Sequence, residues 1–299
     1  MDMFTQVYND IMHIIGNHPV DIQCRGRQMA YELENVRLDI LTRHGISIYS
    51  HQDTRAFPIT FALAEFAWIL AKRDDVESIA HFNKNIVNYS DDTVIMGGAY
   101  GKRLGDQISH AIDRIRADKH TRQACAVIWR EQDSFHTSKD HPCNTFLQFM
   151  IRKDKLYLTV TSRSSDLMTG LPIDTFHWQF LLHIVCNDLL ELYPQLEVGS
   201  VVYNITSLHV YDIDKPMLLS ITDNHLMDIE DASHMIYVPK YMTYTSLSVR
   251  CACGFYSCNN LNDLIDLFGF HEGYANELRN LHLKFINRKH KLERKGDKA

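Results

Sequence analysis

The sequence predicts an α+β fold, because segments with helical and strand-like periodicity follow one another in mixed order. The chain has 299 residues, of which 45% are hydrophobic, and this is enough to bury a sizeable core. It contains no internal repeat, no low-complexity tract and no linker rich in proline or glycine. We therefore expect a single domain over residues 1–286 and a basic tail over residues 287–299. The tail is expected to be a frayed, solvated helix end, with a contact to a partner or ligand as the alternative.

Four segments have the pattern of helices. Apolar residues recur at helical intervals in residues 3–15, 58–72 and 104–117, which predicts helices with one apolar face. Residues 175–190 are strongly apolar and long enough for a central helix.

The remaining regular segments have the pattern of strands. Residues 28–42 alternate between apolar and polar, and residues 124–129 form a short apolar run that suits a buried strand. Residues 145–152 and 156–162 predict two strands joined by a polar turn, and residues 201–210 predict another strand.

Composition narrows the functional class. The net charge of −6 and pI near 6.3 do not suit a protein that coats nucleic acid, although a local basic pocket remains compatible with them. No apolar run reaches the roughly 18 residues that a membrane span needs, and the N-terminus does not resemble a signal peptide. The seven cysteines favour reduced thiols, so we expect a cytoplasmic protein, in the host cytoplasm if phage-encoded.

Three candidate chemical groups lie within about thirty residues. Cys143 follows a proline at a predicted loop-to-strand junction and is a candidate thiolate nucleophile. Arg163 with Ser164 could clamp a phosphate, and Asp174 could read the edge of a base. These groups suit modification of a pyrimidine nucleotide ring. Taken singly, a cysteine is more often a buried apolar residue and an arginine more often a surface charge.

A series of short motifs lies in a fixed order along residues 20–215. The motifs are Arg25-Gly26, the Glu65 helix, Tyr100-Gly101, Thr121-Arg122-Gln123, Pro142-Cys143, Gln148-Phe149, Arg163-Ser164-Ser165-Asp166, Gly170-Leu171-Pro172, and His209 with Tyr211. In this order and spacing they resemble the thymidylate synthase superfamily.

The resemblance implies a fold and a chemistry. Family members are homodimers in which a mixed β-sheet with flanking helices packs sheet-to-sheet against its partner. A cysteine adds to C6 of a pyrimidine nucleotide, and C5 then takes a one-carbon unit from 5,10-methylenetetrahydrofolate. The resemblance implies no metal, no membrane association and no direct binding of nucleic acid.

The resemblance also implies roles for individual residues. The catalytic residues would be Cys143, Glu65, Tyr100 and Asp174. The nucleotide would be held by Arg25, Arg122, Arg163, Ser164, Ser165, Asp174, His209 and Tyr211, with Arg122 donated to the partner's site. Asp166 and Gly170 would bind folate.

Asp174 departs from the synthase pattern, which has asparagine at this place. Cytosine presents an acceptor at N3 and a donor amine at N4, and a protonated carboxyl can donate to the first and accept from the second. At this position the chain resembles the phage deoxycytidylate hydroxymethylases, which indicates dCMP as the substrate rather than dUMP, with CMP remaining open. The alternative is that Asp174 caps a helix that begins at Thr175.

Two further departures concern the fate of the one-carbon unit. The chain ends in charged residues rather than in small apolar ones, and residues 85–91 lack the tryptophan that packs on folate in synthases. Both differences favour capture of a C5 methylene by water, with Glu65 orienting or deprotonating that water. A structural ion pair is the alternative role of Glu65.

The alternatives at other positions also remain open. Gln123 replaces the second subunit-donated arginine, for which Arg103 or Lys102 could compensate. Cys251, Cys253 and Cys258 form a C-x-C-x₄-C pattern that suggests zinc only if a fourth ligand exists. The competing functions are a dCMP or dUMP C5-methyltransferase and a catalytically silent family member that binds nucleotide, folate or RNA.

Overall fold

The computed structural model describes residues 3–24, 26–49, 56–223 and 233–296, and its centre is a mixed seven-stranded sheet. The β6–β8 and β7–β8 pairs are parallel and the remaining pairs are antiparallel, as predicted for a mixed sheet. The path is β1 (Pro19–Cys24), β2 (Arg27–Leu41), β8 (Glu197–Tyr211), β6 (Lys155–Ser162), β5 (Asn144–Arg152) and β4 (Cys125–Val127), with β7 (Ser165–Asp166) beside β8.

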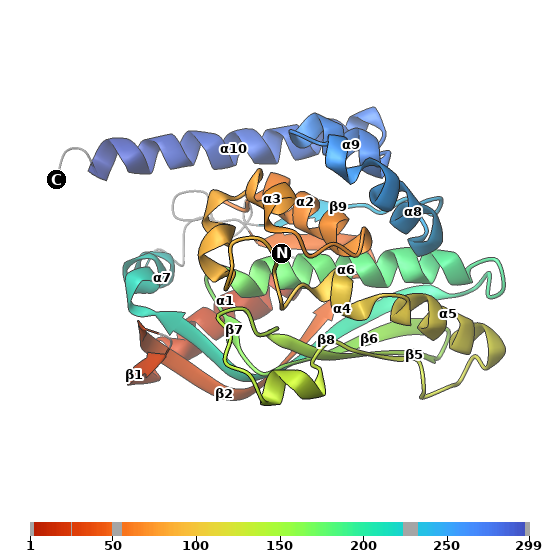
Figure 1. Ribbon diagram of the computed structural model, residues 1–299, viewed down its shortest axis with the longest axis horizontal. Coiled ribbons are helices and arrows are strands. Elements are labelled where there is room, and N and C mark those ends of the chain that lie inside the picture. Colours follow the sequence, from red (N-terminus) through yellow and green to blue (C-terminus); the bar gives the residue numbers. More distant parts are fainter. Residues whose placement is uncertain (1–2, 25, 50–55, 224–232, 297–299) are drawn as a thin grey trace.

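The helices gather on one side of this sheet (Figure 1). β3 (Ile46–Tyr49) and β9 (Ser233–Ile236) form a separate two-stranded sheet. The α-helices are α1 (Met3–Ile15), α2 (Ile59–Leu70), α3 (Val76–Ala80), α4 (Tyr100–Leu104), α5 (Gln107–Ala117), α6 (Gly170–Leu189), α7 (Lys215–Asp223), α8 (Tyr244–Gly254), α9 (Leu261–Phe268) and α10 (Glu272–Gly296). Short 3₁₀ turns are η1 (Lys84–Tyr89), η2 (Glu131–Ser134), η3 (Asp212–Asp214) and η5 (Phe255–Ser257).

The central helix α6 begins earlier than its apolar run suggested. It starts at Gly170 rather than near residue 175, because Pro172 lies in the first turn, where a missing backbone N–H breaks no helical hydrogen bond. The N-cap residue is Thr169. Asp174 therefore lies inside the helix, and the interpretation of Asp174 as a helix cap is wrong.

Two buried polar side chains of α6 form hydrogen bonds with the backbone of residues 42–47. Gln179 accepts a hydrogen bond from the Ser47 N–H at 2.9 Å and donates to the Ser47 carbonyl at 3.1 Å. The His183 Nε2 lies 2.7 Å from the Thr42 carbonyl oxygen. Because unpaired polar groups are costly in a core, these contacts fix the position of α6 against residues 42–47.

The sheet has one buried face and one open face. Along β5, Leu147, Phe149 and Ile151 are fully buried beneath the helices. The side chains on the opposite face of the strand are only partly buried, and they include Phe146 and Met150. The strand alternation therefore leaves apolar side chains on a face that the helices do not cover.

The C-terminal helix α10 continues through the basic tail. It runs from Glu272 to Gly296, beyond residue 287 where the tail was expected to begin. Figure 1 shows it lying along the top of the molecule, with its C-terminal end projecting past the body. Thr60 on α2 hydrogen-bonds the Nδ1 of His282 at 2.8 Å, which attaches the first half of the helix. Within the described residues, no helix has the length and apolar character of a membrane span.

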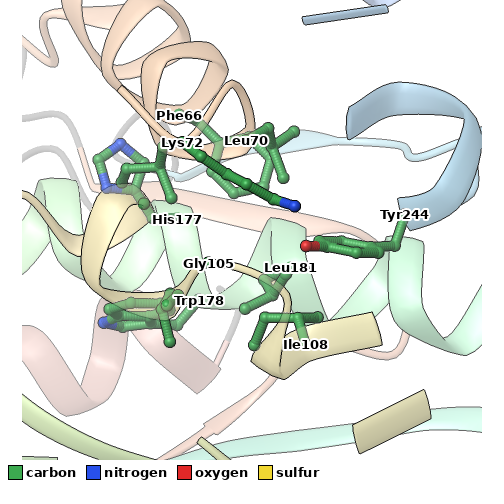
Figure 2. Close-up of a pocket in the computed structure, with 12 residues that line it drawn as sticks. Phe66, Leu70, Lys72, Gly105, Ile108, His177, Trp178, Leu181 and Tyr244 are labelled. Carbon is green, nitrogen blue, oxygen red and sulfur yellow. The ribbon is translucent and has the colours of Figure 1, made fainter. Parts of the chain in front are cut away.

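A small cavity lies between α2, α4, α6 and α8 (Figure 2). Its volume of about 10 Å³ is at the lower limit for one water molecule. Phe66, Leu181 and Tyr244 are among the side chains around it in Figure 2, and Gly101 also lines it. The cavity is too small for a substrate and marks the packing between α4 and α2.

Gly101→Ala is expected to lower stability, because α4 passes very close to α2 at this position. A Cβ at Gly101 would lie 2.1 Å from the Ile69 carbonyl oxygen and 2.7 Å from the Ile69 Cα. The helices would have to separate, at a cost of about 1–3 kcal/mol of unfolding free energy. Thermal melts would measure this loss. Gly97→Ala is the control, since nothing lies within 4 Å of its Cβ, and equal melting of the two variants would contradict the prediction.

Candidate active site

A cavity of about 570 Å³ brings together most of the residues that the sequence singled out. This volume is within the usual range for a small-molecule site. The predicted site residues in its wall are Glu65, Tyr100, Cys143, Arg163, Ser164, Ser165, Asp166, Gly170, Asp174, His209 and Tyr211. They come from α2, α4, the residue before β5, the β6–α6 connection, the first turns of α6 and the end of β8. Arg25 lies outside the described residues.

Cys143 and Arg163 are adjacent at the floor of the cavity. The Arg163 Nη2 lies 3.8 Å from the Cys143 Sγ, a distance at which the guanidinium favours the thiolate form of the sulfur. Arg163 also donates to the carbonyl oxygens of Pro142 and His141, at 3.0 Å each. These backbone contacts fix the arginine to the segment that carries the nucleophile.

The polypeptide around β7 presents polar atoms to the cavity. The Ser165 Oγ and the His209 Nδ1 are buried without a hydrogen-bond partner among the described residues. Buried polar atoms are rarely left unpaired, so these two atoms are available to a ligand. Asp166 accepts hydrogen bonds from the Met168 N–H at 2.8 Å and from the Thr169 hydroxyl, which shapes the turn into α6.

Asp174 is the last of three polar side chains that lie within hydrogen-bonding distance of one another in series. The Tyr203 hydroxyl is 3.1 Å from the Asp174 Oδ2 and 2.5 Å from the Asn144 Oδ1. Burial raises the pKa of Asp174 to about 6, against the opposing effect of its hydrogen bonds with Asn144 and Tyr203. The ionised form therefore predominates at pH 7, and roughly a tenth of the molecules keep the proton on Asp174.

Glu65 is another ionisable carboxyl group in the cavity. Burial raises the pKa of Glu65 to about 8, and the charges of Asp174 and Asp140 add to this effect. Its Oε2 lies 3.8 Å from the His177 Nε2, but burial lowers the pKa of His177 to about 4. His177 is consequently neutral at physiological pH, so Glu65 is not held in a structural ion pair.

Tyr100 begins α4 and stacks on Trp178, with 5.8 Å between the ring centroids. Burial, followed by the charge of Asp174, raises the pKa of Tyr100 well above its usual value of 10. The hydroxyl group therefore stays protonated and can act as a hydrogen-bond donor in the cavity.

Several residues of the site were not singled out from the sequence. Arg27 lines the cavity between the rings of Tyr89 and Tyr211, at 5.5 and 5.2 Å from their centroids. The only available signal was its position two residues after Arg25. Tyr203, by contrast, lies in a strand of mostly apolar residues, and nothing in the sequence connects it with Asp174.

The arginine loop before β4 lies away from this cavity. Arg122 and Gln123 line a separate, open concavity together with Arg114, whose Nη1 donates to the Gln123 Oε1 at 3.2 Å. Arg103 forms a buried ion pair with Asp133 at 2.5 Å and is not available to replace the arginine absent at position 123. Lys102 lies 3.5 Å from Asp74.

The cysteines of the C-x-C-x₄-C pattern differ in exposure. Cys251 and Cys258 are buried, whereas Cys253 is exposed. Burial raises the pKa of Cys258 to about 11 and that of Cys251 still further, so both thiols stay protonated. No group of three metal-binding side chains occurs in the part of the chain that the structure describes.

Glu65→Gln is expected to stabilise the protein at alkaline pH. The folded-state pKa of Glu65, about 8, exceeds its unfolded value near 4.5. The stability linked to its bound proton is complete below pH 4.5 and is lost as the pH rises towards 8. Because the side chain keeps 24% exposure, we expect a gain of about 2–3 kcal/mol at pH 8 rather than the full linkage value.

Chemical denaturation at pH 4.5 and pH 8 would test this expectation. The advantage of Glu65→Gln over the wild type should be present at pH 8 and absent at pH 4.5. Glu191→Gln, a substitution at an exposed position, should show no such difference. A constant difference between Glu65→Gln and the wild type at both pH values would contradict the raised pKa.

The fold has a counterpart among solved structures. The thermostable thymidylate synthase A from Bacillus subtilis superposes with a TM-score of 0.61 at 20% identity, covering 76% of this chain and 86% of that chain. The class of protein is therefore defined by its architecture as a thymidylate synthase fold.

The sequence comparisons identify the family. The thymidylate synthase family model matches residues 8–239. The deoxyuridylate hydroxymethyltransferase of Bacillus phage SP01 is 31% identical over 269 residues, which span 81% of this chain and 68% of that protein. The enzyme of the same name from Pseudomonas phage M6 is 32% identical over 152 residues, 48% of this chain and 42% of that protein. The chain belongs to the thymidylate synthase family.

Membership confirms the predicted class of enzyme. The protein is a one-carbon transferase that modifies C5 of a pyrimidine nucleotide, with 5,10-methylenetetrahydrofolate as the donor of the carbon. The cavity fits such a donor, because apolar side chains (Phe61, Trp68, Ile86 and Ile173) line it together with the polar residues of the β7 segment. An apolar wall suits a flat ring system, and polar atoms suit a nucleotide.

Proposed function

We propose that this enzyme converts dCMP to 5-hydroxymethyl-dCMP. The observation that carries the proposal is the Asp174 carboxyl, which lines the same cavity as the Cys143 sulfur and has a pKa raised to about 6. Such a carboxyl can keep a proton for N3 of cytosine and accept a hydrogen bond from the N4 amine.

Tyr203 supports this assignment by orienting Asp174. Its hydroxyl can donate to the Asp174 Oδ2, which leaves Oδ1 as an acceptor for a ligand. An acceptor at that point matches the amine of cytosine and opposes the O4 of uracil. An asparagine oriented by the same tyrosine would present an N–H group there and would match uracil instead.

The residues of the cavity suit the steps of the reaction. The Cys143 thiolate, stabilised by Arg163, adds to C6 of the base, and C5 becomes the nucleophile that accepts the one-carbon unit. C5 then loses its proton to water as the folate departs with its bonding electrons, which leaves a methylene group on C5. The oxygen of a water molecule bonds to this methylene carbon, and the water proton passes to ionised Glu65. The thiolate then leaves C6, which restores the C5–C6 double bond.

dUMP is the second candidate substrate. The similarity to the deoxyuridylate hydroxymethyltransferases of phages SP01 and M6 favours it. The same carbon transfer and water capture would apply, and only the reading of the base would differ. A methyl product, formed when tetrahydrofolate supplies a hydride and becomes dihydrofolate, is the third outcome.

We also propose a homodimer formed through the open face of the main sheet. The partly buried Phe146 and Met150 lie on this face, and their complete burial by a second copy would be favourable. The exposed Arg122 is near its edge, just before β4, and would reach the phosphate bound by the partner. Sedimentation should show a dimer, and a monomer at catalytic concentrations would contradict this arrangement.

Parallel reactions with dCMP, CMP and dUMP test the proposed function. Each nucleotide is incubated with 5,10-methylenetetrahydrofolate, and the product mass is measured. An increase of about 30 Da from dCMP, without a rise in absorbance at 340 nm, is the expected result. A strong preference for dUMP would overturn the assignment of the base, and an increase of about 14 Da would overturn water capture.

A further inference from the structure

Asp140 is a further carboxyl group in the wall of the catalytic cavity, and none of the roles assigned to the other residues accounts for it. It lies three residues before Cys143 and shares the cavity with Glu65 and Asp174. A cavity that binds an anionic nucleotide gains nothing electrostatically from another acidic side chain. The position of Asp140 therefore needs a chemical explanation.

The orientation of Asp140 is fixed by close contact with Gly98. The Gly98 N–H donates to the Asp140 Oδ2 at 2.7 Å. A Cβ at Gly98 would lie 2.3 Å from the Asp140 carbonyl oxygen and 2.9 Å from its Oδ1, so glycine is needed for this approach. The contact joins the segment before Tyr100 to the segment before Cys143.

A second set of contacts holds the same loop from outside the cavity. Asp91 accepts hydrogen bonds from the Ser138 hydroxyl at 2.6 Å and from the Lys139 N–H at 2.9 Å. The Asp140 N–H in turn donates to the Ser138 Oγ at 2.9 Å. Asp91 does not line the cavity. Asp91 therefore helps to position the loop, whereas Asp140 places a carboxyl group in the cavity.

Asp140 and Glu65 line the same cavity, and the charge of Asp140 is one of the causes that raise the pKa of Glu65. Asp174 and His177 on α6 and Asp140 in the loop before β5 are titratable groups that interact with Glu65. Tyr100, His141, Cys143 and Arg163 line the same cavity. His177 is neutral, and the charges of both aspartates raise the pKa of Glu65. Asp140 is thus one of two acidic groups that influence when Glu65 holds its proton.

We propose that Asp140 is a positioning residue that keeps the wall beside Glu65 polar and hydrated, so that water rather than hydride reaches the C5 methylene. The inference rests on the proposed hydroxymethylation. A carboxyl group retains water at a surface from which an apolar side chain would exclude it. Water that enters here lies next to the glutamate that takes its proton, and the oxygen that adds to the carbon comes from this water.

Asp140→Asn and Asp140→Leu test the proposal, with Asp91→Asn as the matched control for loop position. All four proteins, including the wild type, and Glu65→Gln are assayed for the rate of product formation from dCMP between pH 5 and pH 9, and their products are weighed. Asp140→Asn removes the charge with little change in shape. Asp140→Leu also removes the polar surface. Thermal melts show whether each variant is folded.

Two results are expected. The limb of the pH profile that Glu65→Gln abolishes should move to lower pH by about half a unit or more in Asp140→Asn, because a nearby negative charge has been removed. The ratio of methyl to hydroxymethyl product should rise at least about tenfold in Asp140→Leu, a change of roughly 1.4 kcal/mol in relative barriers. Asp91→Asn should change neither quantity.

Three outcomes would overturn the inference. One is a pH profile in Asp140→Asn that matches the wild type, another is an unchanged product ratio in folded Asp140→Leu, and the third is an equal effect of Asp91→Asn. A wild-type enzyme that makes only methyl product would refute the proposed function instead. In that case the pH profile of Asp140→Asn would still report whether Asp140 acts on Glu65.

Discussion

Asp174→Asn is expected to shift the base preference of the enzyme from dCMP towards dUMP. Tyr203 would hold the amide oxygen of the new residue, as it holds the Asp174 Oδ2 at 3.1 Å. The amide N–H would then meet O4 of uracil favourably and the N4 amine of cytosine unfavourably. Two mismatched polar contacts cost about 1–3 kcal/mol each, so the ratio of the two kcat/KM values should change by about 10³-fold.

Steady-state kinetics with both nucleotides measures this ratio. Asp188→Asn is the matched control, because it makes the same chemical change near the other end of α6, where Asp188 contacts the Thr245 N–H and Arg116. Its preference should equal that of the wild type. If Asp174→Asn kept the preference of the wild type, Asp174 would not read the base.

Cys143→Ala is expected to abolish turnover while leaving nucleotide binding intact. Without the sulfur no bond to C6 forms, and C5 remains too weak a nucleophile to accept the one-carbon unit. The loss should be on the order of 10⁴-fold or more, as for the removal of other covalent nucleophiles. Tritium release measures the chemistry, and calorimetry with dCMP measures binding, which should change less than about threefold.

Cys24 provides a control within the same cavity. It also lines the cavity and is exposed, but nothing places it beside Arg163. Cys24→Ala should keep most of the activity. A large loss in Cys24→Ala together with an active Cys143→Ala would move the nucleophile to Cys24.

The sequence predicted the parts of this site that are local in the chain. The stretch from Cys143 to Asp174 forms a strand pair followed by a helix. Because these elements are consecutive, the order of the motifs in the sequence predicts that their residues lie close together. The helical and strand patterns of α1, α2, β2, β5, β6 and β8 were confirmed for a similar reason, since each depends on periodic burial within one segment. The family and the class of enzyme followed from the same ordered motifs.

The contacts that tune the chemistry could not be predicted in this way. Asp140 contacts Gly98, which is 42 residues away in the sequence, and Asp174 contacts Tyr203, which is 29 residues away. A local sequence pattern cannot predict contacts between such distant residues. The raised pKa values of Glu65 and Asp174 result mainly from burial, which exists only in the folded chain. The apolar run predicts a helix from Thr175, whereas α6 begins at Gly170, because its first turn lies before that run.

The attachment of α6 has a consequence for how this enzyme could evolve. Gln179 and His183 anchor the helix to residues 42–47, and Asp174 is part of the same rigid rod. If the contacts with residues 42–47 shifted, the whole helix would move along its axis, and the Asp174 carboxyl group would move with it. Selection for a new nucleobase should therefore recover changes deep in the interior, more than a helical turn from any atom of the ligand, alongside those in the cavity itself.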